Sequence, residues 1–121
     1  MSDSDRQAFG DQAEALAEQF LRKQGYRILY RNYRTKLGEI DLIAAERRTV
    51  CFIEVKGKHG DDFGPPESAV TGRKQKHLRR AAQLFLLREH LDDVDCRFDV
   101  VSVQPAPDGQ SYTCDLIRGA F

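Results

Sequence analysis

Two hydrophobic, strand-like runs joined by a short polar turn constrain the fold of this chain more than any other feature. The runs are "EIDLIAA" (residues 39–45) and "TVCFIEVK" (residues 49–56), and the turn between them is Glu46–Thr49. Runs rich in Ile, Val and Phe that flank a few polar residues are typical of a β-hairpin. Acidic residues nevertheless interrupt both runs, and the second run also carries a lysine. Charges inside a strand cost stability unless they have partners, so these charges require an explanation.

The remaining chain predicts two helices and three further strands around this hairpin. The first helix keeps apolar residues at helical spacing until Gly25 ends it, and the second helix is strongly basic in its first half. A segment with three glycines and two prolines, residues 57–67, predicts a loop. The predicted helices span residues 11–24 and 67–90, and the predicted strands span residues 26–34, 96–103 and 112–117, the last at the sheet edge. The order helix, three strands, helix, two strands predicts an α/β fold with a mixed sheet flanked by helices.

The composition is that of one globular domain, residues 1–121. It is 40% hydrophobic and 31% charged, which excludes a disordered chain, and no apolar run approaches the roughly 20 residues that span a bilayer. The polar, acidic start is unlike a secretory signal peptide. Cys51, Cys96 and Cys114 are odd in number and lack zinc-site spacing, so we expect reduced, buried thiols in a cytoplasmic protein. Nothing near them in sequence would lower a thiol pKa, which disfavours a cysteine nucleophile.

The hairpin predicts which charged side chains face one another. If the turn pairs Glu46 with Thr49, then Asp41 lies opposite Glu54 and Glu39 lies opposite Lys56, whereas a three-residue loop would break this register. Strand alternation places the first-run side chains on two faces, one with Glu39, Asp41 and Ile43 and the other with Ile40 and Leu42. Two opposed acids destabilise a sheet unless a proton or a cation lies between them.

A divalent cation resolves the conflict between Asp41 and Glu54. Carboxylate oxygens with few other ligands suit Mg²⁺ or Mn²⁺, which keep several waters. Lys56, on the same face as Glu54, would stabilise charge beside the metal, and together these are the groups needed to hydrolyse a phosphodiester. The alternative is an exposed strand face with ion pairs of little energetic value. The two acids in register among hydrophobic neighbours favour a site.

The first helix offers a third acid. Its apolar face centres between Ala13, Ala17 and Phe20, and on this helical wheel Glu14 lies at the border of the face. Glu18 falls on the solvent side and is not a candidate. An ordinary surface role for Glu14 near a helix N-terminus remains the alternative.

Asp41 followed by the Glu54-Val55-Lys56 triplet resembles the active-site pattern of the PD-(D/E)xK nuclease superfamily, which has a restriction-endonuclease-like fold. The chain as a whole resembles the YraN family of small bacterial proteins over about residues 9–104. The stretches that carry the resemblance are "AEALA", "GEIDLIA", "FIEVKGK", "FGPPESAV", "KQKHL" and "RFDVVSV". The resemblance implies a core like that of archaeal Holliday junction resolvases.

The resemblance also implies roles for individual residues. Asp41, Glu54 and the Val55 carbonyl would bind Mg²⁺ or Mn²⁺, Lys56 would be the catalytic lysine, and Glu14 would complete the site as a catalytic acid and further ligand. Glu39 matches a family motif, and its predicted pairing with Lys56 would tune that lysine. The residues expected to contact nucleic acid are Lys58, Arg73, Lys74, Gln75 and Lys76.

These features lead to one main hypothesis and two alternatives. The first is a metal-dependent endonuclease that acts on DNA, including branched or damaged DNA in repair or recombination, with a homodimer as the assembly that would bring two sites together. The second is a nucleic-acid-binding module with the same fold and little activity, and the third is a structural domain. Net charge is zero, but residues 22–36 and 73–80 are locally basic, which suits either phosphate contact or a solvated surface. The sequence leaves the choice between DNA and RNA open.

Overall fold

The computed structural model describes residues 3–57 and 70–121, with side chains from residue 9 onward. Its element order is helix, three strands, helix, two strands, as predicted. The elements are α1 (Asp3–Lys23), β1 (Arg27–Thr35), β2 (Gly38–Glu46), β3 (Thr49–Gly57), α2 (Gly72–Arg88), β4 (Asp95–Pro105) and β5 (Tyr112–Ile117). Helix α1 begins earlier than predicted, whereas α2 begins later, at Gly72, and ends at Arg88 rather than at residue 90. Residues 58–69, which include most of the predicted loop, lie outside the described ranges. No helix in the described ranges is long and apolar enough to cross a membrane.

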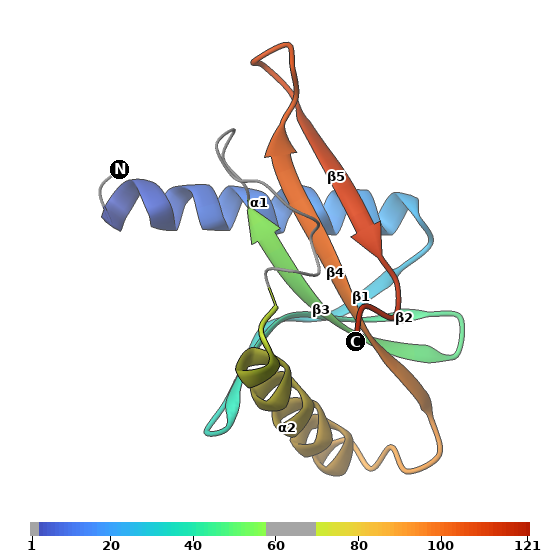
Figure 1. The fold of residues 1–121 in the computed structure, drawn as a ribbon. Helices are drawn as coiled ribbons and strands as arrows, with labels where there is room; N and C mark the ends of the chain where they lie inside the picture. Colours follow the sequence, from blue (N-terminus) through green and yellow to red (C-terminus); the bar gives the residue numbers. More distant parts are fainter. Residues whose placement is uncertain (1–2, 58–69) are drawn as a thin grey trace.

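The five strands form one mixed sheet in the order β1-β2-β3-β4-β5, so β1 and β5 are the edges (Figure 1). Neighbouring strands are antiparallel except β3 and β4, which are parallel. Parallel neighbours need a crossover connection, and α2 lies within it. The antiparallel β2–β3 pair is the hairpin that the sequence predicts.

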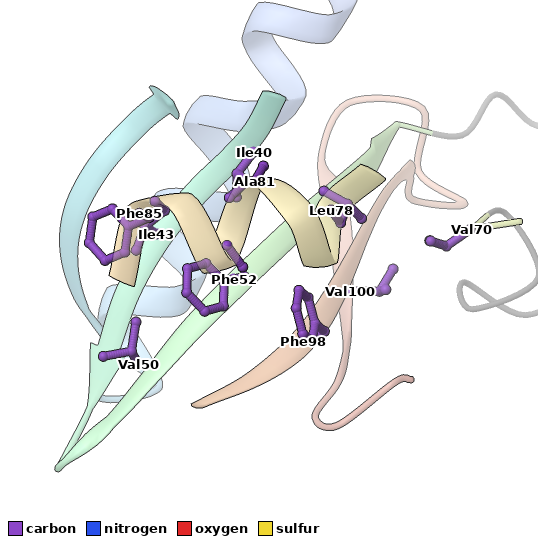
Figure 2. Packing of buried hydrophobic residues seen from close by; sticks show 11 residues of the cluster. Ile40, Ile43, Val50, Phe52, Val70, Leu78, Ala81, Phe85, Phe98 and Val100 are labelled. Carbon is purple, nitrogen blue, oxygen red and sulfur yellow. The ribbon is translucent and has the colours of Figure 1, made fainter. Parts of the chain in front are cut away.

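The two helices cover opposite faces of the sheet. Successive residues of β3 alternate between two hydrophobic clusters, with Phe52 in the cluster against α2 and Cys51 and Ile53 in the cluster against α1. Figure 2 shows the first cluster, in which Leu78, Ala81 and Phe85 of α2 lie over the sheet. Ala13, Ala17 and Leu21 anchor α1 on the other face, as its spacing predicts. Both faces are therefore buried, which explains the long apolar runs in the strands.

Strand alternation fails at Asp41. Ile40 packs with Ile43 in the cluster against α2, whereas Leu42 faces α1, so the predicted placement of Ile40 beside Leu42 is wrong. The neighbouring strand is irregular at the same position, because Asn32, opposite Asp41 on β1, has a positive φ of 49°. Sequence periodicity assumes a regular strand and cannot show such a distortion.

The prediction of three buried thiols is also wrong in part. All three cysteines are free, but only Cys51 is buried, whereas Cys114 is half-buried and Cys96 is exposed near the start of β4. Alternation predicts the face on which a residue lies but not whether a helix covers it there. Burial raises the pKa of Cys51 to about 12, so this thiol is not a nucleophile.

A buried polar network ties the C-terminal segment to the sheet at the end that carries the β2–β3 turn. Asp99 of β4 is completely buried and accepts hydrogen bonds from Tyr26 (2.8 Å), Arg97 (3.0 Å) and the backbone N–H of Gly119 (2.9 Å). Arg97 also forms an ion pair with Glu46. Every polar atom of the Asp99 carboxylate therefore has a partner, which is the condition under which a buried charge is tolerated.

We expect Asp99→Ala to lower the free energy of unfolding by about 3–5 kcal/mol, because it leaves Tyr26, Arg97 and the Gly119 N–H without their common acceptor. Asp95→Ala is the matched control, since Asp95 lies exposed on the same strand. Urea unfolding curves of both variants measure the difference. Equal destabilisation by the two substitutions would contradict a supporting role for the network.

Candidate functional site

The candidate site lies where β2 and β3 separate. Their hydrogen-bonded ladder follows the predicted register and ends at Leu42 and Ile53. Asp41 and Glu54 occupy the next position of that register, just beyond the ladder. There the backbone N–H of Val55 donates to Oδ2 of Asp41 at 2.8 Å. The register is thus confirmed, but strand pairing stops one position short of the two acids, and a side chain replaces a main-chain acceptor.

Asp41 and Glu54 repel each other in a partly water-excluded place. Glu54 is only 6% exposed, and Asp41 is half-buried. Burial, together with the charge of Glu54, raises the pKa of Asp41 to about 8. The ammonium of Lys74, from the first turn of α2, forms an ion pair with Glu54. Lys74 therefore offsets one of the two negative charges. It also lowers the pKa of Asp41, but by less than burial and Glu54 raise it.

Glu14 adds a third carboxylate from α1, so three different elements contribute acids. Burial raises the pKa of Glu14, and repulsion from Asp11, Glu39 and Glu54 raises it further, while a hydrogen bond from Asn32 acts in the opposite direction. Glu14 and Asp41 also repel each other. The three acids thus influence one another's charge, but they do not gather into one cluster among the described residues, so their convergence on a metal stays a prediction.

Two contacts hold α1 against the sheet beside the site. Gly57 ends β3 so close to α1 that a Cβ atom there would lie 2.5 Å from the Phe9 ring and 3.3 Å from Ala13. One turn after Glu14, Glu18 accepts hydrogen bonds from Arg31 of β1, with an Nε–Oε2 distance of 2.7 Å. The expectation that Glu18 faces solvent is wrong, since only 14% of its side chain is exposed. The apolar stripe of α1 predicts which side of the helix packs on the sheet. It does not predict that Arg31 of β1 reaches around the helix to Glu18.

Of the other residues expected at the site, Lys56 lies beside the acids and Glu39 does not. Lys56 is half-buried and follows Glu54 on the same strand face, and no described carboxylate forms an ion pair with it. Glu39 does not pair with Lys56, because the ladder ends first, and it forms an ion pair with Arg34 at 3.6 Å. The Val55 carbonyl is adjacent to the acids by position in the chain.

Of the residues predicted to contact nucleic acid, Arg73 and Lys76 are exposed on α2. Gln75 instead donates to the backbone carbonyl of Val70 at 3.1 Å, so its side chain holds the residues that precede α2 against the first turn of the helix. Lys58 lies outside the described residues.

Three residues of this region were not recognised from the sequence: Lys74 as a partner of Glu54, Arg31 as a partner of Glu18, and Asn32 beside Glu14. Helical spacing held a signal for Lys74, because it precedes the buried Leu78 by one turn and so lies on the sheet side of α2. Asn within the strand-like stretch "YRNYR" is also unusual, since Asn is depleted in strands.

The donor set fits a hard divalent cation. No three His, Cys, Asp or Glu side chains come together as a ready-made cage among residues 9–57 and 70–121. Mg²⁺, however, is usually held by one or two carboxylates, with waters and substrate oxygens completing its shell. Asp41 and Glu54 supply two carboxylates, and burial, together with the charge of Glu54, raises the pKa of Asp41 although Lys74 lies beside Glu54.

We expect Asp41→Asn to raise the melting temperature of the metal-free protein by about 4 °C or more at about pH 8.5, the effect of about 1 kcal/mol in a domain of this size. Asn retains an acceptor for the Val55 N–H but removes the repulsion with Glu54. Between its ordinary pKa of 3.8 and about 8, the folded protein holds a proton on Asp41 that the unfolded chain releases, so stability falls as pH rises through this window. Asn does not titrate, and the advantage of the variant should grow from about pH 5 to about pH 8.5.

Thermal melts in EDTA across this pH range test the prediction. Asp115→Asn is the control, because Asp115 is exposed on β5 and its replacement removes the same charge elsewhere. A difference between Asp41→Asn and wild type that does not change with pH would contradict the assignment.

Comparison with known proteins identifies the family. A family model described as uncharacterised protein family UPF0102 matches residues 13–103, a range that includes Glu14, Asp41, Glu54 and Lys74. A UPF0102 protein of Symbiobacterium thermophilum is 47% identical over 112 residues, covering 93% of this chain and 94% of that protein. A UPF0102 protein of Caldicellulosiruptor saccharolyticus is 42% identical over 116 residues, covering 96% and 98%. The chain therefore belongs to the UPF0102 family, the YraN family that its motifs resemble.

Proposed function

We propose that this protein is a divalent-metal-dependent nuclease that hydrolyses phosphodiester bonds in DNA, with Asp41 and Glu54 as the ligands of Mg²⁺ or Mn²⁺. The observation that carries the proposal is the pair of mutually repelling carboxylates held at the point where β2 and β3 separate. A structural domain gains nothing from such a pair, because an apolar pair of similar size would be more stable. A cation-binding site requires it.

The chain's own residues have distinct parts in this proposal. Asp41 is oriented by the Val55 N–H, and Glu54 is fixed by its burial, so both carboxylates are held before any ligand arrives. When bound, the metal would polarise a phosphoryl oxygen and lower the pKa of a coordinated water. Lys56 would stabilise the negative charge that develops on the phosphate. Glu14 would accept a hydrogen bond from a water on the α1 side, and the Val55 carbonyl would add an oxygen ligand.

The outer face of α2 is the proposed DNA contact. Arg73, Lys76 and Arg80 follow one another at i, i+3 and i+7, so they lie along one side of the helix. All three are exposed and form no ion pair with a described residue. A row of unpaired cations next to Lys74 suits a sugar–phosphate backbone that passes the site. Branched DNA, with a homodimer that presents two sites, is the substrate class that follows from the resemblance to junction resolvases.

A nucleic-acid-binding module without turnover is the second candidate, and one observation favours it. Lys74 already forms an ion pair with Glu54, which lowers the net charge available to a cation. In this case the α2 face would bind nucleic acid while the acids bind no metal. Activity measurements separate the two candidates.

We expect wild-type protein to cut at least one DNA in Mg²⁺ or Mn²⁺ and none in EDTA, with Asp41→Asn and Lys56→Ala reducing the rate at least about 100-fold, because each removes charge stabilisation at the reacting phosphate. The measurement is a panel of labelled single-stranded, duplex, flap and four-way-junction DNA, together with RNA. Light scattering on the same samples gives the oligomeric state.

The controls for this panel are Asp115→Asn and Lys36→Ala, which remove the same charges at exposed positions outside the site. Circular dichroism confirms that every variant is folded. If wild type binds a nucleic acid but cuts none of them, the binding-module candidate replaces the nuclease.

We expect the triple substitution of Arg73, Lys76 and Arg80 to Gln to weaken DNA binding and to reduce the slope of log K against log salt by about 2–3, because each lost phosphate contact removes about 0.9 from the slope. Fluorescence anisotropy with Asp41→Asn as the background avoids cleavage during the titration. The matched control replaces Arg27, Arg47 and Arg48, which are equally exposed near the β2–β3 turn. Equal slopes for the two triple variants would exclude α2 as the contact surface.

A further inference from the structure

Asn32 has an unusual backbone conformation for a residue inside a strand. Its φ of 49° lies in the left-handed region, where side chains other than glycine are uncommon and Asn is among the most tolerant. Two other non-glycine residues of the described ranges, Arg47 and His90, share a positive φ, and both lie just outside a strand or helix. Backbone strain inside an element persists only where the surroundings enforce it, and it gathers at functional sites.

The distortion at Asn32 lies directly opposite Asp41. The β1–β2 register pairs Arg31 with Leu42 and Tyr33 with Ile40, and it omits the position between them, which belongs to Asn32 and Asp41. The β2–β3 ladder also stops before Asp41. Asp41 therefore lacks a ladder partner on both sides of β2, and its carboxylate accepts the Val55 N–H instead.

The side chain of Asn32 connects this distortion to α1. It lines a surface pocket together with Arg31 of β1 and Glu14 and Glu18 of α1. Within this pocket the Arg31 guanidinium binds Glu18. Asn32 lies beside Glu14, one helical turn away from Glu18, and lowers the pKa of that carboxyl. Two adjacent residues of β1 thus face two carboxylates that are one turn apart on α1.

We propose that Asn32 is a positioning residue of the site, whose side-chain amide holds the Glu14 carboxylate beside Asp41. The left-handed backbone turns the amide toward α1, where a regular strand residue opposite Asp41 would follow the pleat. An amide suits this task better than a cation, because its N–H orients a carboxylate without neutralising it. One oxygen of Glu14 and its full negative charge remain available to the site. The functional part of this inference rests on the proposed metal-dependent activity, whereas the contact between Asn32 and Glu14 does not.

Two substitutions separate the amide from the backbone. Asn32→Gly permits the positive φ but removes the side chain, and Asn32→Asp keeps the size and shape but replaces the donor with an acceptor. Arg47→Gly is the matched control, because Arg47 has a φ of 56° in the turn between β2 and β3 and the substitution relieves the same kind of strain away from the site.

We expect Asn32→Gly and Asn32→Asp each to weaken Mn²⁺ binding about 10-fold or more in calorimetric titrations, the usual effect of losing a residue that orients a ligand. Arg47→Gly should bind Mn²⁺ like wild type. The melting temperature of metal-free Asn32→Gly should equal or exceed that of wild type, because relief of strain offsets the lost hydrogen bond. Wild-type Mn²⁺ affinity in Asn32→Gly would overturn the proposal, and wild-type affinity in Asn32→Asp would overturn the role of the donor.

A spectroscopic measurement tests the contact independently of metal. In ¹⁵N-labelled, metal-free protein, the Asn32 carboxamide resonances should shift in Glu14→Gln and stay close to wild type in Asp11→Asn, which removes the same charge from the same pocket. If wild type binds no Mn²⁺ but the resonances respond to Glu14, the proposed metal site fails while the positioning contact stands. If the resonances do not respond to Glu14, the positioning role is overturned whatever the metal affinity.

Discussion

The hydrogen bond from the Val55 N–H to the Asp41 carboxylate is the interaction on which the arrangement of the site depends. It closes the β2–β3 interface with a side chain at the point where the ladder ends, so the two strands can separate without leaving that N–H unpaired. The same bond fixes Asp41 beside Glu54, where burial and like charge raise its pKa to about 8. The Asp41 carboxylate therefore provides the acceptor that the Val55 N–H of the sheet needs, and it also bears the repulsion from Glu54.

Other acids of the same sheet are compensated in a way that Asp41 is not. At the end of the sheet that carries the β2–β3 turn, Asp99 is as deeply buried as any residue, yet it has three hydrogen-bond donors. Glu46 nearby has its pKa lowered to about 2, chiefly by Arg118. Acids at that end are thus fully compensated, whereas Asp41 and Glu14 have raised pKa values. This contrast within one sheet supports the proposal that Asp41 and Glu14 serve a ligand rather than the fold.

Sequence periodicity predicted the element order and the hairpin register, because these follow from side-chain spacing in regular helices and strands. It failed where the chain departs from regularity. Alternation breaks between Ile40 and Leu42, opposite the positive φ of Asn32, and nothing in the sequence pattern signals that break. Spacing within one element also cannot show which residue of another element reaches it, so the Arg31–Glu18 contact was not foreseen.

Helix α2 links the acids to the proposed DNA surface. Lys74 contacts Glu54 on the inner side of its first turn, while Arg73 and Lys76 are exposed on the outer side of the same turn. A phosphate bound to the outer cations and the charge on Glu54 would therefore both act on the first turn of α2, which Thr71 caps through the Lys74 N–H. A cation that competed with Lys74 for Glu54 would alter the charge next to the proposed phosphate contacts. By linkage, nucleic acid and cation would then affect each other's binding, and this coupling distinguishes a nuclease site from two unrelated surface features.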